Sequence, residues 1–259
     1  RLDSELVRRG LARSREAATD LIAAGNVLVS GMPASKAATQ VDAETSIILK
    51  DDHAEFVSRG GHKLAGALDK FTQIDVSGKT ALDAGASTGG FTDVLLKRGA
   101  KKVVAVDVGY GQLAWELQKD TRVKILDRVN VRNLTSAQVG EEIDLVVADL
   151  SFISLKLVLP ALISVAKEGA DFLVMVKPQF EVGKEKLGAG GVVRDVHLRK
   201  EAVVAVADAA FALTLGTLGV VASPLPGPSG NVEYFLWLRK GAPALLEVDL
   251  DLAIEKGPA

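Results

Sequence analysis

Four charged residues flank apolar runs of the sequence, and their side-chain types suit proton transfer. Asp149 comes directly after the apolar run 145–148, and Lys177 comes directly after a second run at 172–176. Glu233 precedes a third apolar run, and Lys63 stands near the start of an amphipathic stretch. A lysine that is partly desolvated or crowded by a second ammonium group loses proton affinity and can act as a base. Each residue alone is equally well explained as a surface charge, but together they indicate a site that activates a weakly acidic hydroxyl.

A glycine-rich stretch provides a second candidate site, in this case for a nucleotide. Residues 82–91 read Leu-Asp-Ala-Gly-Ala-Ser-Thr-Gly-Gly-Phe and lie between an apolar run and a helical pattern. The spacing matches neither the dinucleotide motif Gly-x-Gly-x-x-Gly nor the phosphate-binding motif that ends in Gly-Lys-Ser/Thr. A nucleotide with little or no phosphate fits better, and Asp107, at the end of the next strand, can accept both ribose hydroxyls. Asp83 is either part of this site or a helix-capping carboxylate, and the loop with Asp107 favours cofactor binding over a structural turn.

The elements that would position these residues are strands and helices that alternate from about residue 56 onward. Strands are predicted at 80–84, 102–107, 123–126, 143–149, 171–176, 215–223 and 233–238. Helices are predicted at 90–98, 112–119, 155–167 and 195–213, after a lead-in helix with apolar residues at 64, 67, 68 and 71. This alternation predicts a mostly parallel sheet covered on both faces, with ligands at the carboxyl ends of the strands. Only a Pro/Gly-rich turn joins the last two strands, which predicts an antiparallel final strand.

The first 55 residues predict a separate small module, with a polar junction near 50–57 and a second domain at 58–259. Leu2, Leu6 and Val7 indicate one helix, Ser14 can cap a second that ends near Gly25, and 27–29 and 45–49 read as strands. Its basic residues form either a solvated face or a phosphate-binding face. The RNA-binding candidates are Arg1, Arg8, Arg9, Arg13, Arg15 and, at the start of the second domain, Arg59. A glycine-rich segment at 183–191 is either a segment that folds over RNA or a disordered surface loop.

Composition excludes several classes of protein. The 259 residues are 48% hydrophobic and 25% charged, with 31 Lys and Arg against 33 Asp and Glu, which is typical of a folded globular chain. The absence of cysteine excludes disulfide scaffolds and thiolate metal sites and favours a reducing compartment, and three scattered histidines make a metal site improbable. The charged start is not a secretory signal, and no apolar run is long enough to span a membrane.

Several of these motifs resemble known families. The loop at 82–91 resembles motif I of the S-adenosylmethionine-dependent methyltransferases, with Asp107 matching their ribose-binding acid. The ordered set Lys63, Asp149, Lys177 and Glu233 resembles the Lys-Asp-Lys-Glu tetrad of the FtsJ-like ribose 2′-O-methyltransferases. The segments 58–63, 149–154, 177–181 and 227–233 resemble the TlyA family, also called hemolysin A, and this resemblance spans essentially the whole chain. The N-terminal module resembles the αL RNA-binding motif of the fourth small-subunit ribosomal protein.

The resemblance implies an α/β fold, with a Rossmann-like class I methyltransferase sheet, an antiparallel last strand and a small N-terminal α+β RNA-binding module. It implies S-adenosylmethionine as cofactor, no metal, and catalysis by the four residues of the tetrad. The implied cofactor-binding residues are Asp83, Gly85, Ser87, Gly89, Gly90, Phe91, Asp107, Asp127 and Asn130, the last two on the adenine side.

The same resemblance implies methylation of a cytidine ribose in large-subunit ribosomal RNA, with small-subunit RNA left open as a second target. The expected partners are ribosomal RNA and ribosomal subunits in the cytoplasm, with no membrane. Two alternatives from other classes stay open. The first is a non-catalytic RNA-binding or ribosome-assembly factor. The second is a membrane-active hemolysin, which the lack of a spanning segment or a long basic amphipathic helix disfavours.

Overall fold

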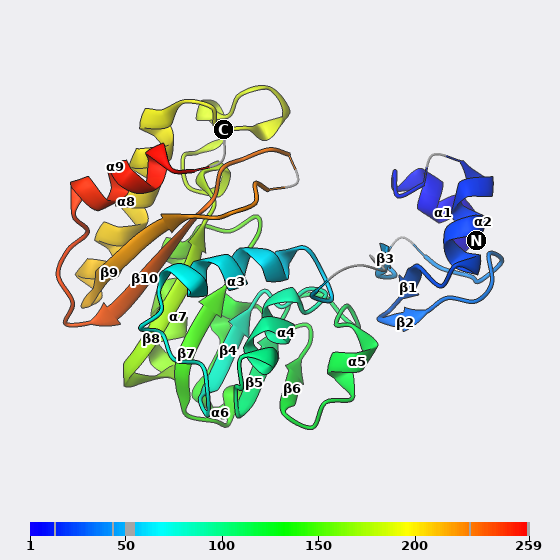
Figure 1. Ribbon diagram of the computed structural model, residues 1–259, viewed down its shortest axis with the longest axis horizontal. Coiled ribbons are helices and arrows are strands. Elements are labelled where there is room, and N and C mark those ends of the chain that lie inside the picture. The colour runs from blue at the N-terminus through cyan, green and yellow to red at the C-terminus, as the bar shows by residue number, and fades with distance from the viewer. Residues whose placement is uncertain (13, 43, 50–54, 228, 258–259) are drawn as a thin grey trace.

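Two β-sheets, each with its own hydrophobic core, divide the chain (Figure 1). The computed structural model describes residues 1–257 apart from 13, 43, 50–54 and 228. The N-terminal sheet has the strand order β2-β1-β3, and the C-terminal sheet has the order β6-β5-β4-β7-β8-β10-β9. Most of the predicted junction at 50–57 lies outside the described residues, so the exact domain boundaries stay a prediction.

The N-terminal module packs two helices on the small sheet. Its elements are α1 (Leu2–Arg8), α2 (Arg15–Ala23), β1 (Val27–Val29), β2 (Met32–Pro33) and β3 (Ile47–Leu49). The hydroxyl of Ser14 accepts the N–H of Ala17 and caps α2, as predicted. Leu2, Leu6 and Ile22 come from the inner helix faces and meet the sheet in one small core. Both predicted helices are confirmed, whereas β2 was not predicted.

The large sheet confirms the predicted topology. Its strands are β4 (Thr80–Ala84), β5 (Lys102–Val106), β6 (Val123–Leu126), β7 (Ile143–Ala148), β8 (Ala166–Val176), β9 (Leu215–Ala222) and β10 (Tyr234–Lys240). Strands β4 to β8 pair in parallel, whereas β10 is antiparallel to both β8 and β9. The start of β10 therefore lies at the same edge of the sheet as the ends of the parallel strands.

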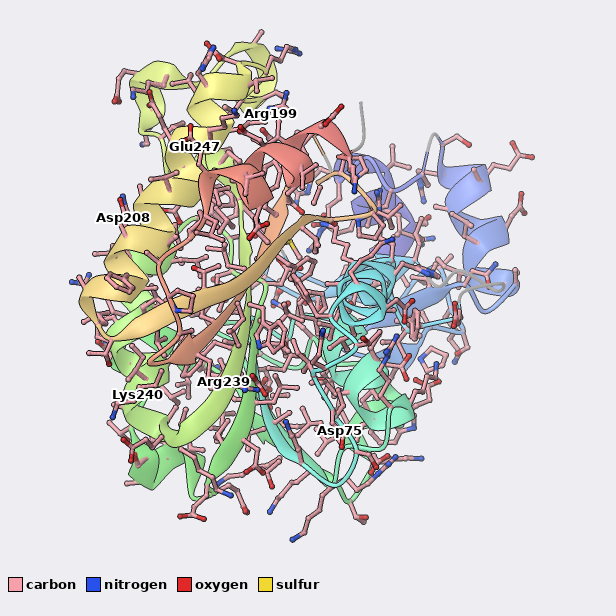
Figure 2. All side chains as sticks on the ribbon, turned by 60° about the vertical axis from the view of Figure 1, so that its left-hand side comes forward. Asp75, Arg199, Asp208, Arg239, Lys240 and Glu247 are labelled. Atoms are coloured by element: carbon pink, nitrogen blue, oxygen red, sulfur yellow. The ribbon has the colours of Figure 1, made fainter. Side chains whose placement is uncertain are left out.

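Helices cover both faces of the large sheet (Figures 1 and 2). One face carries α3 (Gly60–Lys70), α4 (Gly90–Lys97) and α5 (Trp115–Gln118), and the other carries α6 (Ser136–Val139), α7 (Leu155–Val165), α8 (Val196–Ala212) and α9 (Glu247–Glu255). Alternate residues of each strand enter the two cores: Leu82 faces α7 and α8, while its neighbour Ala81 faces α3 and α4. The predicted three-layer α/β arrangement is confirmed.

Three element predictions need correction. The helix expected at 112–119 is only α5, at 115–118, because residues 107–114 run as a loop beside the sheet. The helix expected at 155–167 ends at Val165, since β8 begins at Ala166, before the predicted residue 171. Exposed Lys167 and Glu168 give this part of β8 the polarity of a helix end or turn. Short α6 and C-terminal α9 were not predicted; α6 begins with a capping box between Thr135 and Gln138.

Candidate active site

Two of the four predicted catalytic residues meet at the carboxyl edge of the parallel strands. Asp149 directly follows β7 and Lys177 directly follows β8, and these strands are neighbours in the sheet. The Nζ atom of Lys177 lies 2.5 Å from Oδ1 of Asp149 and donates a hydrogen bond to the hydroxyl of Ser151 at 3.1 Å. Lys177 is buried, so its ammonium group depends on these two partners in place of water.

The other two residues form a second ion pair at the same edge. Lys63 lies in the first turn of α3, and Glu233 stands just before β10. Their Nζ and Oε2 atoms are 2.5 Å apart, and the side chains are only 7% and 1% exposed. The remaining oxygen of Glu233, Oε1, has no hydrogen-bond partner among the described residues. A buried carboxylate oxygen without a partner is costly, which favours a role in binding a group that enters from outside.

The two ion pairs border two adjoining cavities. A cavity of about 450 Å³ is lined by Asp149 together with the glycine-rich loop and Asp107. A second cavity of about 750 Å³ is lined by Lys177 and Glu233. The segment Ser151, Phe152 and Ile153 borders both cavities, so they are neighbours. The Lys177–Asp149 pair therefore has one member in each cavity.

The smaller of these cavities has the features of a nucleoside site. The two carboxylate oxygens of Asp107 accept the N–H groups of Ser87, at 2.8 Å, and Gly109, at 2.7 Å, which fixes the carboxylate at the cavity wall. A Cβ on Gly85 would lie 2.5 Å from the carbonyl oxygen of Asp149, so the loop can pass this close only with glycine. A fixed acid beside exposed loop backbone fits a ribose and a nucleobase without phosphate. These residues fit S-adenosylmethionine.

The structure separates the predicted cofactor residues into two groups. Residues that line the cavities are Gly85, Ser87, Asp107 and Asn130 in the 450 Å³ cavity, and Gly85, Ser87, Gly90 and Phe91 in a smaller one of about 110 Å³. Asp83, Gly89 and Asp127 line none of these described cavities. The Asp127 carboxylate instead accepts the N–H of Gly111 at 2.9 Å.

Asp83 lies beneath the glycine-rich loop. It is fully buried, and its Oδ2 accepts the hydroxyl hydrogen of Thr92, in the first turn of α4, at 2.7 Å. Burial raises the pKa of Asp83 to about 7, and the hydrogen bond from Thr92 opposes this rise. The contact joins Asp83 to α4 through a side-chain hydroxyl, and the assignment of Asp83 to the cofactor site stays a prediction.

Several site residues escaped the sequence analysis although they lie within or beside the predicted motifs. Ser58 lines the 110 Å³ cavity beside the glycine-rich loop, and Ser151 is a partner of Lys177. Asn231 accepts the N–H of Val193 at 2.8 Å and donates to the carbonyl of Gly191 at 3.1 Å. It thereby ties the end of the glycine-rich segment 183–191 to the active site, where that segment lines the 750 Å³ cavity. The sequence signal that could have identified these residues is the presence of small polar residues next to the charged motifs.

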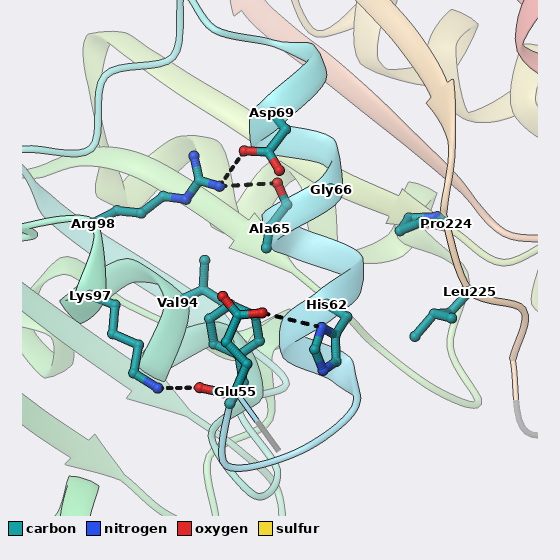
Figure 3. A pocket seen from close by; sticks show the side chains of 11 residues that line it. Glu55, His62, Ala65, Gly66, Asp69, Val94, Lys97, Arg98, Pro224 and Leu225 are labelled. Carbon is teal, nitrogen blue, oxygen red and sulfur yellow. Dashed lines mark hydrogen bonds and ion pairs between the residues drawn. The ribbon is translucent and has the colours of Figure 1, made fainter. Parts of the chain in front are cut away.

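A further cavity of about 660 Å³ lies against the outer side of α3 and α4 (Figure 3). Its basic side chains are already paired: Arg98 binds Asp69 at 2.6 Å, and Lys97 donates to the backbone carbonyl of Glu55. His62 lies 3.9 Å from the Glu55 carboxylate. No member of the tetrad lines this cavity, and its balanced charges favour no single class of ligand.

The predicted RNA-binding arginines of the N-terminal module gather around two acids. Arg1 and Arg15 both contact buried Asp3, at 3.1 and 2.6 Å. Arg8 and Arg9 both contact Glu5, at 2.5 and 2.8 Å, and their hydrogen bonds lower the pKa of Glu5 to about 2. Arg1, Arg8 and Arg15 are exposed. Arg13 lies outside the described residues, and Arg59, also exposed, donates to the carbonyl of Pro226 in the large domain.

Comparisons with known proteins agree with this geometry. Residues 56–240 match the FtsJ-like methyltransferase family, and residues 1–47 match the S4 domain. The 16S/23S rRNA (cytidine-2′-O)-methyltransferase TlyA of Mycobacterium tuberculosis is 57% identical, over 100% of this chain and 98% of that protein. Hemolysin A of Brachyspira hyodysenteriae is 37% identical over 90% of this chain and 97% of its own length. A solved structure named as a hemolysin, from Streptococcus thermophilus, has a TM-score of 0.77 at 35% identity, covering 99% of this chain and 94% of that one.

The fold, the tetrad and these matches define an FtsJ-like methyltransferase with an N-terminal S4 domain. Within that class, the chain belongs to the TlyA family. The family and fold class predicted from the sequence are thereby confirmed. Among the helices that the structure describes, none is both long and apolar enough to cross a membrane.

Proposed function

We propose that this protein transfers a methyl group from S-adenosylmethionine to the ribose 2′-hydroxyl of a cytidine in ribosomal RNA. The observation that carries this proposal is the division of the Lys177–Asp149 ion pair between two cavities. Asp149 borders the cavity with Asp107 and the glycine-rich loop, which suits the cofactor. Lys177 borders the larger cavity, which suits the substrate ribose. The 2.5 Å contact between their side chains supports donor and acceptor sites that lie side by side.

The cofactor supplies a methyl group on a positively charged sulfur, and the chain supplies the charges that direct its transfer. When bound, the cofactor would give up this methyl group to the ribose 2′-oxygen and leave as the neutral sulfide, so the ribose hydroxyl would have to lose its proton. As an ammonium group held by Asp149 and Ser151, Lys177 can stabilise the negative charge that develops on the oxygen. It can accept the hydroxyl proton once one of its own protons has passed to the Asp149 carboxylate, 2.5 Å away. The Lys63–Glu233 pair fixes the second wall of the substrate cavity.

The substrate cavity fits a nucleotide turned out of a folded RNA. Phe152 is 91% exposed at the junction of the two cavities and lies 5.2 Å, between ring centroids, from Phe180. An exposed aromatic ring beside a catalytic site can stack on an unpaired base. The printed name of the M. tuberculosis relative, at 57% identity, supports cytidine in ribosomal RNA as the target.

The S4 domain supplies the second contact with RNA in this proposal. Arg1, Arg8 and Arg15 are exposed and already oriented by Asp3 and Glu5, so phosphate groups can replace or join these carboxylates as partners. Such contacts position structured RNA without reading its sequence. Ribosomal subunits in the cytoplasm are therefore the partners we propose.

The test is transfer of labelled methyl from S-adenosylmethionine to separated large and small ribosomal subunits and to their naked RNA. Label on a cytidine 2′-oxygen, located by ribose-specific mapping, is the expected result, and the four substrates decide which particle or RNA is used. Asp107→Ala, which removes the proposed ribose ligand, should weaken cofactor binding. RNA binding without any label would instead support the non-catalytic assembly factor and contradict the proposed reaction.

A further inference from the structure

The β1–β2 turn of the N-terminal module contacts the large domain directly. Ser30 and Gly31 are its two central residues, and both have positive φ values, +50° and +78°, as in the tight turns that suit hairpins. The N–H of Trp115, the first residue of α5, donates a hydrogen bond of 3.0 Å to the carbonyl of Gly31. A Cβ on Gly31 would lie 2.2 Å from the carbonyl oxygen of Leu113 and 2.6 Å from Nε2 of Gln118. The close contact therefore requires glycine.

The far side of the segment that receives this turn, residues 111–118, packs against the glycine-rich loop. The N–H of Ala114 donates to the carbonyl of Thr88 at 3.0 Å. A Cβ on Gly89 would lie 2.2 Å from Leu117 and 2.8 Å from Leu113, so both leucines lie directly against the loop backbone. Leu113 therefore meets the N-terminal turn with its backbone and the glycine-rich loop with its side chain.

The same segment also forms part of the cofactor cavity. Gln112 lines this cavity beside Asp107. The neighbouring N–H of Gly111 donates to the Asp127 carboxylate at 2.9 Å. Regular structure in the segment is limited to the four residues of α5, so its position depends on contacts at its two sides. One of these sides is the glycine-rich loop, and the other is the turn at Ser30 and Gly31.

We propose that the Ser30–Gly31 turn is a positioning element for the cofactor site. Docking of the turn holds segment 111–118 against Thr88 and Gly89 and keeps Gln112 at the cavity wall. Affinity for the cofactor then depends on the N-terminal domain even when no RNA is bound. By thermodynamic reciprocity, a bound cofactor strengthens the docking of that domain. This inference rests on the proposed function, because it takes S-adenosylmethionine as the cofactor.

The test uses two glycines with the same backbone conformation and different surroundings. Gly31 has φ +78° and Gly25 has φ +77°, but a Cβ on Gly25 would meet nothing within 4 Å. Gly31→Ala and Gly25→Ala therefore both place alanine at nearly the same positive φ, and only Gly31→Ala disturbs the contact with α5. Calorimetric titration of the full chain with S-adenosylmethionine, without RNA, should give a Kd raised at least about fivefold for Gly31→Ala, the lower end of usual site-to-site coupling. Gly25→Ala should bind as the unaltered protein does.

A second pair of variants tests the hydrogen bond between Trp115 and Gly31 itself. This pair also provides the test if Gly31→Ala does not fold. Proline is tolerated at the first position of a helix, so Trp115→Pro removes the N–H that reaches Gly31, whereas Trp115→Ala keeps it. Weaker cofactor binding in Trp115→Pro than in Trp115→Ala is the expected result. A positioning role also predicts a raised KM for the cofactor with kcat retained at saturating cofactor.

Three outcomes separate this inference from the proposed function. Equal Kd values for folded Gly31→Ala, Gly25→Ala and the unaltered protein would overturn the positioning role, and so would a loss confined to RNA affinity. A failure of the unaltered protein to bind S-adenosylmethionine at all would instead contradict the proposed cofactor. Melting curves of each variant show whether the chains being compared are folded.

Discussion

The ion pairs of the catalytic edge and those of the S4 domain both use a poorly exposed acid, and they differ in how far the basic partner is exposed. The Lys63–Glu233 contact is 2.5 Å long and its side chains are 7% and 1% exposed, whereas in the 2.6 Å Arg15–Asp3 contact Arg15 is 60% exposed. Taking one partner from a buried pair typically costs about 3–5 kcal/mol, because the other charge is left without water or a counter-ion. Loss of Arg15 costs less although Asp3 is only 4% exposed, because Arg15 itself is largely solvated and Arg1 stays beside the same carboxylate.

This difference suits the two regions for different tasks. An exposed arginine can exchange a carboxylate for a phosphate at small cost, so the S4 domain can bind RNA through groups that are already ordered. A buried lysine changes its partner only when a polar group enters its cavity. Under the proposed function, the catalytic pairs would hold fixed charges for the reacting hydroxyl, and the S4 pairs would hold arginines ready for the RNA backbone.

The largest effect predicted by this comparison is loss of methyl transfer in Lys177→Ala. Positioned proton-transfer groups contribute about 10²–10⁴-fold to rate, so kcat in the labelled-methyl assay should fall by that factor. Lys167→Ala is the matched control, because both lysines belong to the region of β8, with Lys167 near its start and Lys177 just after its end. Lys167 is paired with Asp144 at 2.7 Å, and its replacement should leave kcat unchanged.

RNA affinity distinguishes a catalytic defect from a binding defect in the same variant. Lys177 lines the cavity proposed for one nucleotide, while the exposed arginines lie in the other domain, so RNA binding by Lys177→Ala should stay close to that of the unaltered chain. Equal methylation by Lys177→Ala and the unaltered chain would show that the buried pair is structural.

The catalytic edge could be predicted well from the sequence because its residues stand at strand ends. Asp149, Lys177 and Glu233 border apolar runs, and the parallel order of the strands brings such positions to one edge. The alternation of strands and helices likewise indicated the large sheet and its antiparallel last strand. The two buried ion pairs follow from that topology, although the pairing of Lys63 with Glu233 depends on packing of α3 that no spacing shows.

The features that the sequence did not predict depend on contacts between distant segments. The first residues of β8 are polar, and in this stretch β8 pairs with β7 only through Ala166, with a register shift before pairing resumes at Asp171. Asn231 reads as a turn residue until its hydrogen bonds to Val193 and Gly191 are seen. Gly31 likewise reads as an ordinary hairpin glycine, and its contact with α5 joins residues more than eighty positions apart. The local sequence pattern around a residue contains no information about contacts with residues that are distant in the chain.

The second-largest effect that we predict is a dependence of stability on pH. It arises from Asp83, a buried carboxylate that has no cation beside it among the described residues. Burial raises the pKa of Asp83 to about 7, so the folded chain holds a proton there that the unfolded chain releases near pH 4. The associated stability is present below pH 4 and is lost as the pH rises to about 7. Melting temperatures measured between pH 5 and 8 should therefore fall with pH, and Asp83→Asn, which keeps an acceptor for Thr92, should remove this slope.

The pKa of Glu5 shifts in the opposite direction, so Glu5 provides the control for the Asp83 variant. Hydrogen bonds from Arg8 and Arg9 lower the pKa of Glu5 to about 2, so its contribution to stability is present above pH 4.5 and is lost as the pH falls toward 2. Glu5→Gln should therefore change the melting profile only on the acid side. An unchanged slope between pH 5 and 8 in Asp83→Asn would show that Asp83 is ionised in the folded protein.

The smallest effect is expected from a single exposed arginine. Each phosphate contact contributes about one to the slope of log K against log salt, so Arg15→Ala should reduce the slope for ribosomal RNA binding by about one. Arg239→Ala is a close control, because Arg239 also lies 2.6 Å from a buried aspartate, Asp171, and Figure 2 places it among the elements of the large sheet. Its loss should leave the slope unchanged, because the two arginines differ in position and not in their pairing. If both variants lowered the slope equally, the RNA would be binding to general positive charge, and the exposed arginines of the S4 domain would have no special part in it.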